Sequence, residues 1–401
     1  MSDAARATKI FFQTGLVRRA LIGAYFPLLA VRVVTDVDLS PLQLVLLGTA
    51  MEVAILLAEV PTGVVADLHS RRWSVIIAFL IGGPAIVVTA FAEPIWALLL
   101  ASAAFGVSVT FESGAETAWV TDELGSPELA EPLILRRAQW QMFATIFGVA
   151  IFAGIAALIT LTTALAALGL LHAAWGISLI FRMPENKFAP IGHTGWTGFV
   201  SLLRRGWQLS MSTSILRVLV LAVFIGGLAK EAIDRLDVQR LEDIGLPNDI
   251  DEAVVIGVIV AVRSLFAAAV VFIARRRATG RQVVTATAVM FIGMAIAVAV
   301  LAHMELLLIA AIVLIVRDGF SRAIEPVVTT WANAFASSDA RATVHSFIGQ
   351  AEAFGEIIGG IALGTVAQVF TVPTAMTISA VLFLIAGGLA LTGSTHYRAA
   401  T

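Results

Sequence analysis

The chain has 401 residues, of which 59% are hydrophobic and only 13% are charged, and its mean hydropathy is +0.93. Soluble chains carry about 25% charged residues, so this composition excludes a water-soluble protein and indicates an integral membrane protein. The net charge of -2 excludes nucleic-acid binding as a main function, and the lack of cysteine excludes disulfide frameworks, thiolate metal sites and cysteine nucleophiles.

Apolar runs long enough to cross a bilayer follow one another along the chain. A spanning helix needs about 20 predominantly apolar residues. Such runs, separated by polar, glycine or proline breaks, predict twelve spans, at 10–34, 42–66, 73–92, 95–120, 137–157, 162–182, 212–233, 252–274, 283–302, 305–334, 343–368 and 374–394. We therefore expect an all-α membrane protein with twelve transmembrane helices.

The spans fall into two groups of six. We expect an N-terminal six-helix bundle at 1–182, a cytoplasmic linker at 183–211 and a C-terminal six-helix bundle at 212–401. Gly114 and Gly319 are separated by 205 residues, as are Arg136 and Arg341, and this shared offset favours a parallel repeat of six helices. Two such halves form a cleft at the bilayer midplane, which alternating access exposes to each side in turn.

The linker carries an amphipathic pattern that predicts an interfacial helix. Its apolar side chains fall near one helical face, at Trp196, Phe199, Leu202, Leu203 and Trp207. Arg204 and Arg205 lie on another face. We expect this helix to tie the two halves together at the inner surface.

The distribution of basic residues predicts the orientation. With both termini in the cytoplasm, the inside loops hold sixteen of the twenty-six Lys and Arg residues, whereas the outside ends hold four. The positive-inside rule therefore places both termini on the cytoplasmic side of the cell (inner) membrane. The segment 230–252 has eight acidic and three basic residues, and we expect it to be an external loop.

The junction of the second and third spans reads EVPTGVVADLHSRRW. It resembles the major facilitator superfamily signature G-x-x-x-D-x-x-G-[RK]-[RK]. Gly63, Asp67, Arg71 and Arg72 match this signature, while Ser70 replaces its second glycine. The resemblance implies the major facilitator fold, which consists of two pseudo-symmetric six-helix bundles.

Three further segments sharpen the resemblance to a bacterial efflux-like branch of that superfamily. They are the E-x-P-T-G sequence at 59–63, SGAETAWVTDEL at 113–124 and RATVHS at 341–346. Two departures weaken the inference of antiport. Proton-coupled drug antiporters commonly carry an arginine where this chain has Ser102, and they carry a Gly-Pro pair in the fifth span, which this chain lacks.

The resemblance implies a gating role for Asp67, Arg71, Arg72 and Asp122. In the family, the loop aspartate caps the eleventh helix in the outward-facing state, and the arginine pairs with an acid at the end of the fourth span, here Asp122. Helix N-termini attract carboxylates, so such a loop can hold one conformation closed. The alternative is that Arg71 and Arg72 only enforce topology.

Charges within the N-terminal spans are candidates for proton coupling, because an ionised side chain at the bilayer centre costs on the order of 3 kcal/mol. These candidates are Glu112, Glu116 and Glu52. Glu112 and Glu116 are four residues apart, so we expect them to share a helix face and one of them to hold a proton. The alternative for Glu112 is a structural ion pair with Arg18 or Arg19.

The C-terminal spans supply the candidate substrate-cavity residues Arg263, Arg317, Asp318 and Glu356. We expect Arg263 to pair with a carboxylate such as Glu356, which favours a neutral or cationic amphiphile as substrate. An unpaired Arg263 would instead bind an anion. Arg317 and Asp318 point about 100° apart on a helix, so we expect them to serve different neighbours.

The sequence therefore predicts a secondary active transporter and not an enzyme, since no nucleophile elbow or phosphate-binding loop is visible. We expect proton-coupled export of amphiphilic drugs or metabolites. The alternatives are an uptake symporter or facilitator for a small organic anion and a non-transporting membrane sensor or scaffold. The expected partners are a small-molecule substrate, protons and the lipid bilayer. We expect a monomer with no cofactor, no metal and no nucleic acid.

Overall fold

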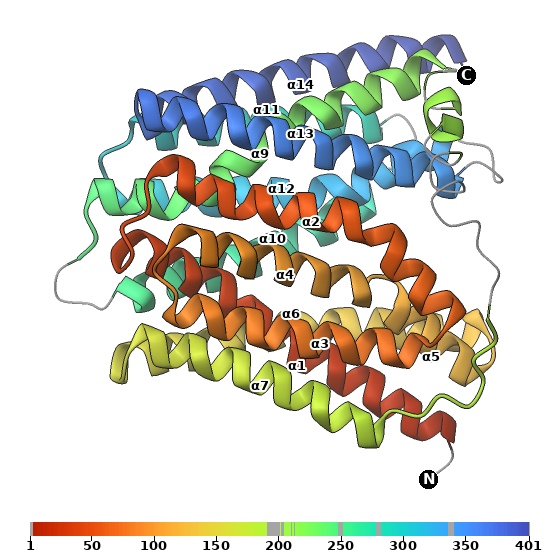
Figure 1. Ribbon diagram of the computed structural model, residues 1–401. Coiled ribbons are helices and arrows are strands. Elements are labelled where there is room, and N and C mark those ends of the chain that lie inside the picture. The colour runs from red at the N-terminus through yellow and green to blue at the C-terminus, as the bar shows by residue number, and fades with distance from the viewer. Residues whose placement is uncertain are drawn as a thin grey trace. The chain divides into compact units, whose positions relative to one another are not determined.

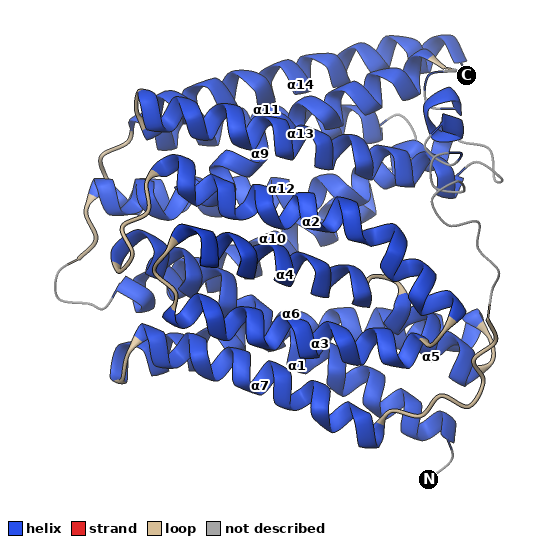
Figure 2. Cartoon of the chain, in the orientation of Figure 1, coloured by secondary structure: helices blue, strands red, loops and turns tan. Residues whose placement is uncertain are grey.

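The computed structural model describes residues 3–190, 204–209, 213–247, 252–277, 282–335 and 341–400, together with residues 201 and 211. Within this part of the chain, thirteen helices have defined bounds (Figures 1 and 2). The all-α class expected from the sequence is confirmed. In the expected interfacial helix, Trp196, Phe199, Leu202 and Leu203 lie outside the described residues.

The chain divides into two compact units. Unit 1 comprises residues 1–38, 50–198 and 248–261, and unit 2 comprises 39–49, 199–247 and 262–401. Two long helices therefore contribute their first turns to one unit and their remainder to the other. They are α2 (Pro41–Leu68) and α10 (Glu252–Arg277).

Unit 1 contains most of α2 and six further helices. These are α1 (Asp3–Thr35), α3 (Arg71–Phe91), α4 (Ile95–Glu112), α5 (Ala115–Leu124), α6 (Pro127–Leu158) and α7 (Leu161–Arg182). Gly114, with φ of 75°, separates α4 from α5, because this backbone conformation favours glycine and interrupts the helix. Together α4 and α5 form one 30-residue span.

Unit 2 contains most of α10 and five further helices. These are α9 (Ser214–Ile244), α11 (Gln282–His303), α12 (Leu307–Phe335), α13 (Arg341–Val369) and α14 (Val372–Ala400). The expectation that an external loop begins at residue 230 is wrong, because α9 continues to Ile244. Its later turns bury Glu231, Asp237 and Arg240, so these charges belong to the protein interior.

The same helix pairings recur in both units. In unit 1, α1 packs against α6, and α3 packs against α4 and α7. In unit 2, the helices at the corresponding positions pair in the same way: α9 packs against α13, and α11 packs against α12 and α14. This recurrence of helix pairings fits the two pseudo-symmetric bundles expected from the sequence.

Among the described residues, eight helical segments are long and apolar enough to cross a membrane. The four other long helices are α1, α9, α12 and α13, with 33, 31, 29 and 29 residues. At about 1.5 Å per residue each exceeds a hydrocarbon core of about 30 Å. All four carry charged side chains that other helices cover, and these charges lower their hydropathy.

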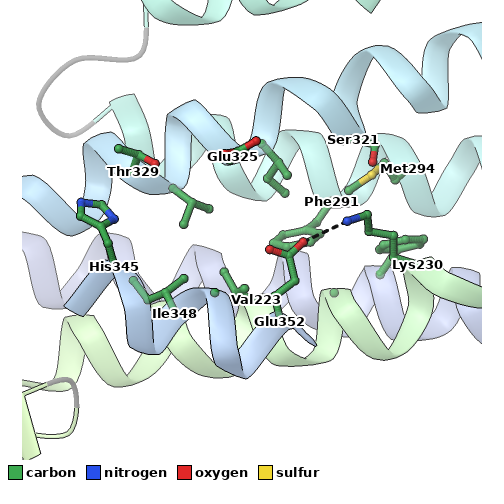
Figure 3. Close-up of a pocket in the computed structure, with 15 residues that line it drawn as sticks. Val223, Lys230, Phe291, Met294, Ser321, Glu325, Thr329, His345, Ile348 and Glu352 are labelled. Atoms are coloured by element: carbon green, nitrogen blue, oxygen red, sulfur yellow. Dashed lines mark hydrogen bonds and ion pairs between the residues drawn. The ribbon is translucent and has the colours of Figure 1, made fainter. Parts of the chain in front are cut away.

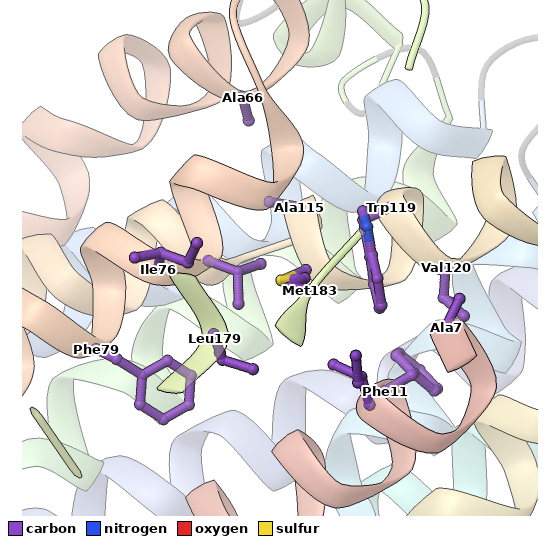
Figure 4. Close-up of a cluster of buried hydrophobic side chains, with 12 residues drawn as sticks. Ala7, Phe11, Ala66, Ile76, Phe79, Ala115, Trp119, Val120, Leu179 and Met183 are labelled. Carbon is purple, nitrogen blue, oxygen red and sulfur yellow. The ribbon is translucent and has the colours of Figure 1, made fainter. Parts of the chain in front are cut away.

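A cluster of buried apolar side chains lies within unit 1 (Figure 4). It joins Phe11 of α1, Phe79 of α3, Trp119 of α5 and Leu179 of α7. The indole nitrogen of Trp119 donates a hydrogen bond to the carbonyl of Pro184 at 2.6 Å. The cluster therefore fixes both the end of α7 and the start of the linker beside the loop between α2 and α3.

Candidate functional site

The loop between α2 and α3 is held by ion pairs within unit 1. Arg71 pairs with Asp122 of α5 and lies 3.5 Å from the carboxylate of Asp67. Its guanidinium also donates to the carbonyl of Ala118 at 3.3 Å. The structure therefore brings together three of the four residues expected to gate, with Arg71 buried between two carboxylates.

Arg72 serves a different contact. Its guanidinium donates to the carbonyl of Ile180 at 2.5 Å, and its backbone nitrogen donates to Glu185 at 2.8 Å. Both acceptors lie at the end of α7 or in the residues that follow it. Arg72 thus attaches the loop to the end of α7 and the start of the linker.

Glu112 and Glu116 do not share one helix face, so that expectation is wrong. The positive φ of Gly114 ends α4 at Glu112 and starts α5 at Ala115. Each carboxylate instead pairs with its own arginine: Glu112 with Arg18 of α1, and Glu116 with Arg137 of α6 at 2.6 Å. The alternative considered for Glu112, an ion pair with Arg18, is the observed arrangement.

Both carboxylates are nearly inaccessible, because their side chains are 8% and 5% exposed. Arg137 is held further by the ring of Phe11, whose centroid lies 3.6 Å from the guanidinium carbon. Glu52, the third candidate, lies within α2 and is partly buried. Unit 1 thus contains two buried Arg–Glu pairs near the break between α4 and α5.

In unit 2, Arg263 belongs to a buried ion network. Its guanidinium contacts Asp237 of α9 at 2.9 Å and Asp318 of α12 at 2.6 Å. The expected pairing of Arg263 with an acid is observed, but the choice of Glu356 as that acid is wrong. Arg263 is therefore satisfied by two aspartates and offers no free charge to an anion.

Arg317 joins the same network. It pairs with Asp234 of α9, and it also contacts Asp318 at 3.0 Å. The expectation that Arg317 and Asp318 serve only different neighbours is wrong, because the long guanidinium side chain reaches back to the adjacent carboxylate. The network thus combines two guanidiniums with three carboxylates and links α9, α10 and α12.

Glu356 lies in a second charged group on α9 and α13. Lys230 contacts Glu356 at 2.7 Å and Glu352 at 3.2 Å. These side chains meet because α9 and α13 approach closely: a β-carbon on Gly227 would lie 2.5 Å from the carbonyl oxygen of Glu352. Only glycine permits this close backbone contact, and the contact brings Lys230 of α9 within reach of the two carboxylates of α13.

A cavity of about 350 Å³ adjoins this second group, entirely within unit 2. Figure 3 shows the Lys230–Glu352 contact at its edge, with Glu325 on α12 and His345 on α13 among the other lining residues. Apolar side chains complete the lining, including Val223, Phe291, Met294, Ile348 and Phe383. None of Arg263, Arg317, Asp318 and Glu356 lines it, although Glu356 holds its lysine.

Sequence reasoning missed Lys230, Asp234 and Asp237 as interior charges. They were assigned to a loop because acidic residues are frequent there. Their spacing of four and three residues is helical, so all three recur on one face of a continued α9. Sequence reasoning also did not identify Glu325 and Glu352 as cavity residues, since the sequence alone does not show which helix faces meet.

Several solved structures share this fold. A mutant of the nucleoside transporter NupG superposes with a TM-score of 0.77 at 14% identity, covering 98% of this chain and 99% of that chain. A bacterial homolog of the human lysosomal transporter Spinster, in an inward-facing and unoccupied conformation, gives 0.70 at 14% identity over 99% and 97% of the chains. The POT family transporter PepTSo gives 0.78 at 11% identity over 98% of both.

These identities are low, so the superpositions show the fold alone. No curated protein matches the sequence significantly. The family model of the Major Facilitator Superfamily matches residues 12–360, which is most of the chain. The family and the shared fold point to a transporter rather than an enzyme. The chain belongs to the major facilitator superfamily.

Proposed function

We propose that the protein is a secondary active transporter that exports amphiphilic drugs or metabolites by alternating access, driven by the proton gradient. The observation that carries the choice of substrate is the cavity of unit 2. It presents an apolar lining that includes Phe291 and Phe383 next to the charged side chains Lys230, Glu325 and Glu352. An amphiphile, with an apolar body and a polar end, matches such a lining.

Proton coupling is assigned to the buried carboxylates of unit 1. Glu112 and Glu116 are each neutralised by an arginine, so a proton on either carboxylate would replace the positive partner and release it. Such an exchange links protonation to a rearrangement of α1 or α6. Glu52 is retained as a third candidate.

The outward direction rests on the resemblance of the 59–73 loop to an efflux-like branch. Within that proposal, Asp67, Arg71 and Asp122 close the cytoplasmic side in the outward-facing state, and Arg72 anchors the loop. The distribution of basic residues supports cytoplasmic termini in the inner membrane. We further propose that the transporter works as a monomer.

Uptake of a small organic anion is the second candidate within the fold. It required a free guanidinium at Arg263 or Arg317, and the aspartates of α9 and α12 already occupy both. One of the similar structures is the human organic anion transporter MFSD10, with a TM-score of 0.63 at 18% identity over 97% of this chain and 100% of that chain. A non-transporting scaffold has no need of the buried charges.

Flux measurements in reconstituted vesicles test this proposal. The purified protein is reconstituted into vesicles that contain a pH-sensitive dye, and a pH gradient is imposed across their membrane. Addition of an amphiphile should then release protons from the vesicle interior. Vesicles without protein give the background. Substrate flux that ignores the pH gradient would support a facilitator, and no flux for any amphiphile or organic anion would support the scaffold.

A further inference from the structure

The ammonium group of Lys230 is shared unequally between two carboxylates. Glu356 lies 2.7 Å away and its side chain is 10% exposed, whereas Glu352 lies 3.2 Å away and its side chain is 36% exposed. The shorter and more buried contact is the stronger ion pair. Lys230 can therefore remain neutralised by Glu356 if Glu352 turns to another cation.

Glu325 supplies a second acidic group to the same cavity. It lines the cavity from α12, while Glu352 lines it from α13 (Figure 3). Glu325 makes no hydrogen bond or ion pair with any residue that the structure describes. The cavity thus holds one lysine against two lining carboxylates, and Glu356 behind the lysine adds a third.

The remaining lining provides room for an apolar body. Phe291, Met294 and Phe383 form buried apolar surface beside the charged end. Gly349 also lines the cavity, and a β-carbon built on it meets no atom within 4 Å. The space next to α13 at this position is therefore open, whereas Gly355 and Gly359 of the same helix pack tightly against α9.

We propose that this cavity binds an amphiphilic organic cation, with Glu352 and Glu325 as the counter-charges of its ammonium group and the phenylalanine rings around its apolar body. The inference rests on the proposed transport function and names its substrate class. When the ligand binds, Glu352 exchanges the Lys230 ammonium for that of the ligand, and Lys230 stays with Glu356. No buried charge loses its partner in this exchange.

An anionic amphiphile meets the opposite situation. It would have to draw Lys230 away from Glu356 and Glu352, which separates both carboxylates from their lysine in a low-dielectric environment near Glu325. A neutral amphiphile gains the apolar contacts but no ion pair. The expected order of affinity is therefore cation, then neutral molecule, then anion.

Binding of three matched ligands to the purified full-length protein tests this order. Phenylbutylamine, phenylbutanol and phenylbutyrate share one apolar body and differ in charge, and titration calorimetry measures each. Glu325→Gln is the main variant, because its removal leaves no described residue unpaired. Glu352→Gln is the second variant, and its thermal stability is measured alongside.

We expect each glutamine variant to bind phenylbutylamine about tenfold more weakly, and to bind phenylbutanol unchanged. Gly349→Met should weaken all three ligands because its side chain fills the open space. Gly388→Met is the matched control: Gly388 lies on α14, does not line the cavity and also has open space around its β-carbon position. It should bind all three ligands as the native protein does.

Equal affinity for the three ligands, a preference for phenylbutyrate, or unchanged phenylbutylamine binding by both glutamine variants would overturn the proposal. The binding and flux experiments distinguish failure of the cavity assignment from failure of the transport proposal. Cation binding without gradient-driven flux would refute the transport proposal and keep the cavity assignment, whereas proton-driven flux with a preference for phenylbutyrate would do the reverse.

Discussion

Glu185 caps the first turn of α3 through Ser70. One carboxylate oxygen accepts a hydrogen bond from the Ser70 hydroxyl at 2.5 Å, and the other accepts one from the backbone nitrogen of Arg72 at 2.8 Å. The Ser70 hydroxyl oxygen itself accepts from the backbone nitrogen of Trp73 at 2.9 Å. Ser70 stands where the family signature has glycine, so this departure gives the start of the linker a direct attachment to the loop.

Removing either member of this contact should lower stability. We expect Ser70→Gly and Glu185→Ala each to cost about 1 kcal/mol, because backbone donors at the start of α3 lose their acceptors. The double variant should cost less than the sum of the two single variants, since both remove the same contact. Thermal unfolding in detergent measures the three values, and strict additivity would show that the two side chains act independently.

Asp67→Asn should shift the protein towards the inward-open state. The substitution removes one of the two negative partners of Arg71, which weakens the closure proposed for the cytoplasmic side. The chain has no cysteine, so single introduced cysteines report accessibility from each side without a background.

The matched control is Glu131→Gln, which also removes one carboxylate but from an exposed position on α6. Labelling at cytoplasmic positions should rise in Asp67→Asn and stay unchanged in Glu131→Gln. An identical labelling pattern in native protein and Asp67→Asn would rule out a gating role for this aspartate.

Glu112→Gln should abolish gradient-driven flux and keep ligand binding, because the site of protonation proposed in unit 1 is lost while the cavity of unit 2 is untouched. The variant also leaves Arg18, whose side chain is 28% exposed, without its Glu112 partner, and an unpaired charge in such a partly buried position lowers stability. Loss of flux could then reflect misfolding.

The double variant Arg18→Gln/Glu112→Gln separates these causes. It removes both charges, so it should recover most of the thermal stability but not the proton-driven flux. Glu116→Gln and Arg137→Gln/Glu116→Gln form the equivalent series. Normal pH-driven flux in both stable double variants would exclude these carboxylates as proton carriers.

Much of the fold was predictable from the sequence, because the length and spacing of apolar runs directly reflect a bilayer. The exceptions occur where helices carry charges. The sequence predicts that the span beginning at residue 212 ends near residue 233, since Asp234, Asp237 and Arg240 resemble a solvated loop in composition. In the folded protein their charges are neutralised by α10, α12 and Glu305, which follows α11, and no single segment reveals these partners.

The partners within the sites were less predictable than the residues themselves. Intramembrane charge drew attention to Arg263, Glu112 and Glu356, and each of these residues takes part in an ion pair. Their partners depend on which helix faces meet and, for α9 and α13, on a glycine contact at Gly227 that sets how near the backbones come. A break at Gly114 likewise separates two glutamates that a continuous helix would place together.

Arg263→Ala should destabilise the protein rather than alter its preference for substrate charge. Its guanidinium is the shared partner of Asp237 and Asp318, so its removal leaves two buried carboxylates to be satisfied by Arg317 alone. The expected cost is about 3–5 kcal/mol, as for other buried charges that lose a partner.

Asp237→Asn in the same chain should recover part of that loss, since it removes one of the two stranded charges. Thermal unfolding of native protein, Arg263→Ala and Arg263→Ala/Asp237→Asn gives the stability order. Binding of phenylbutylamine and phenylbutyrate to whichever variants remain folded gives the charge preference, which should still favour the amine because the cavity does not include Arg263. Selective loss of phenylbutyrate binding in a stable Arg263→Ala protein would instead make Arg263 a substrate ligand and favour transport of organic anions.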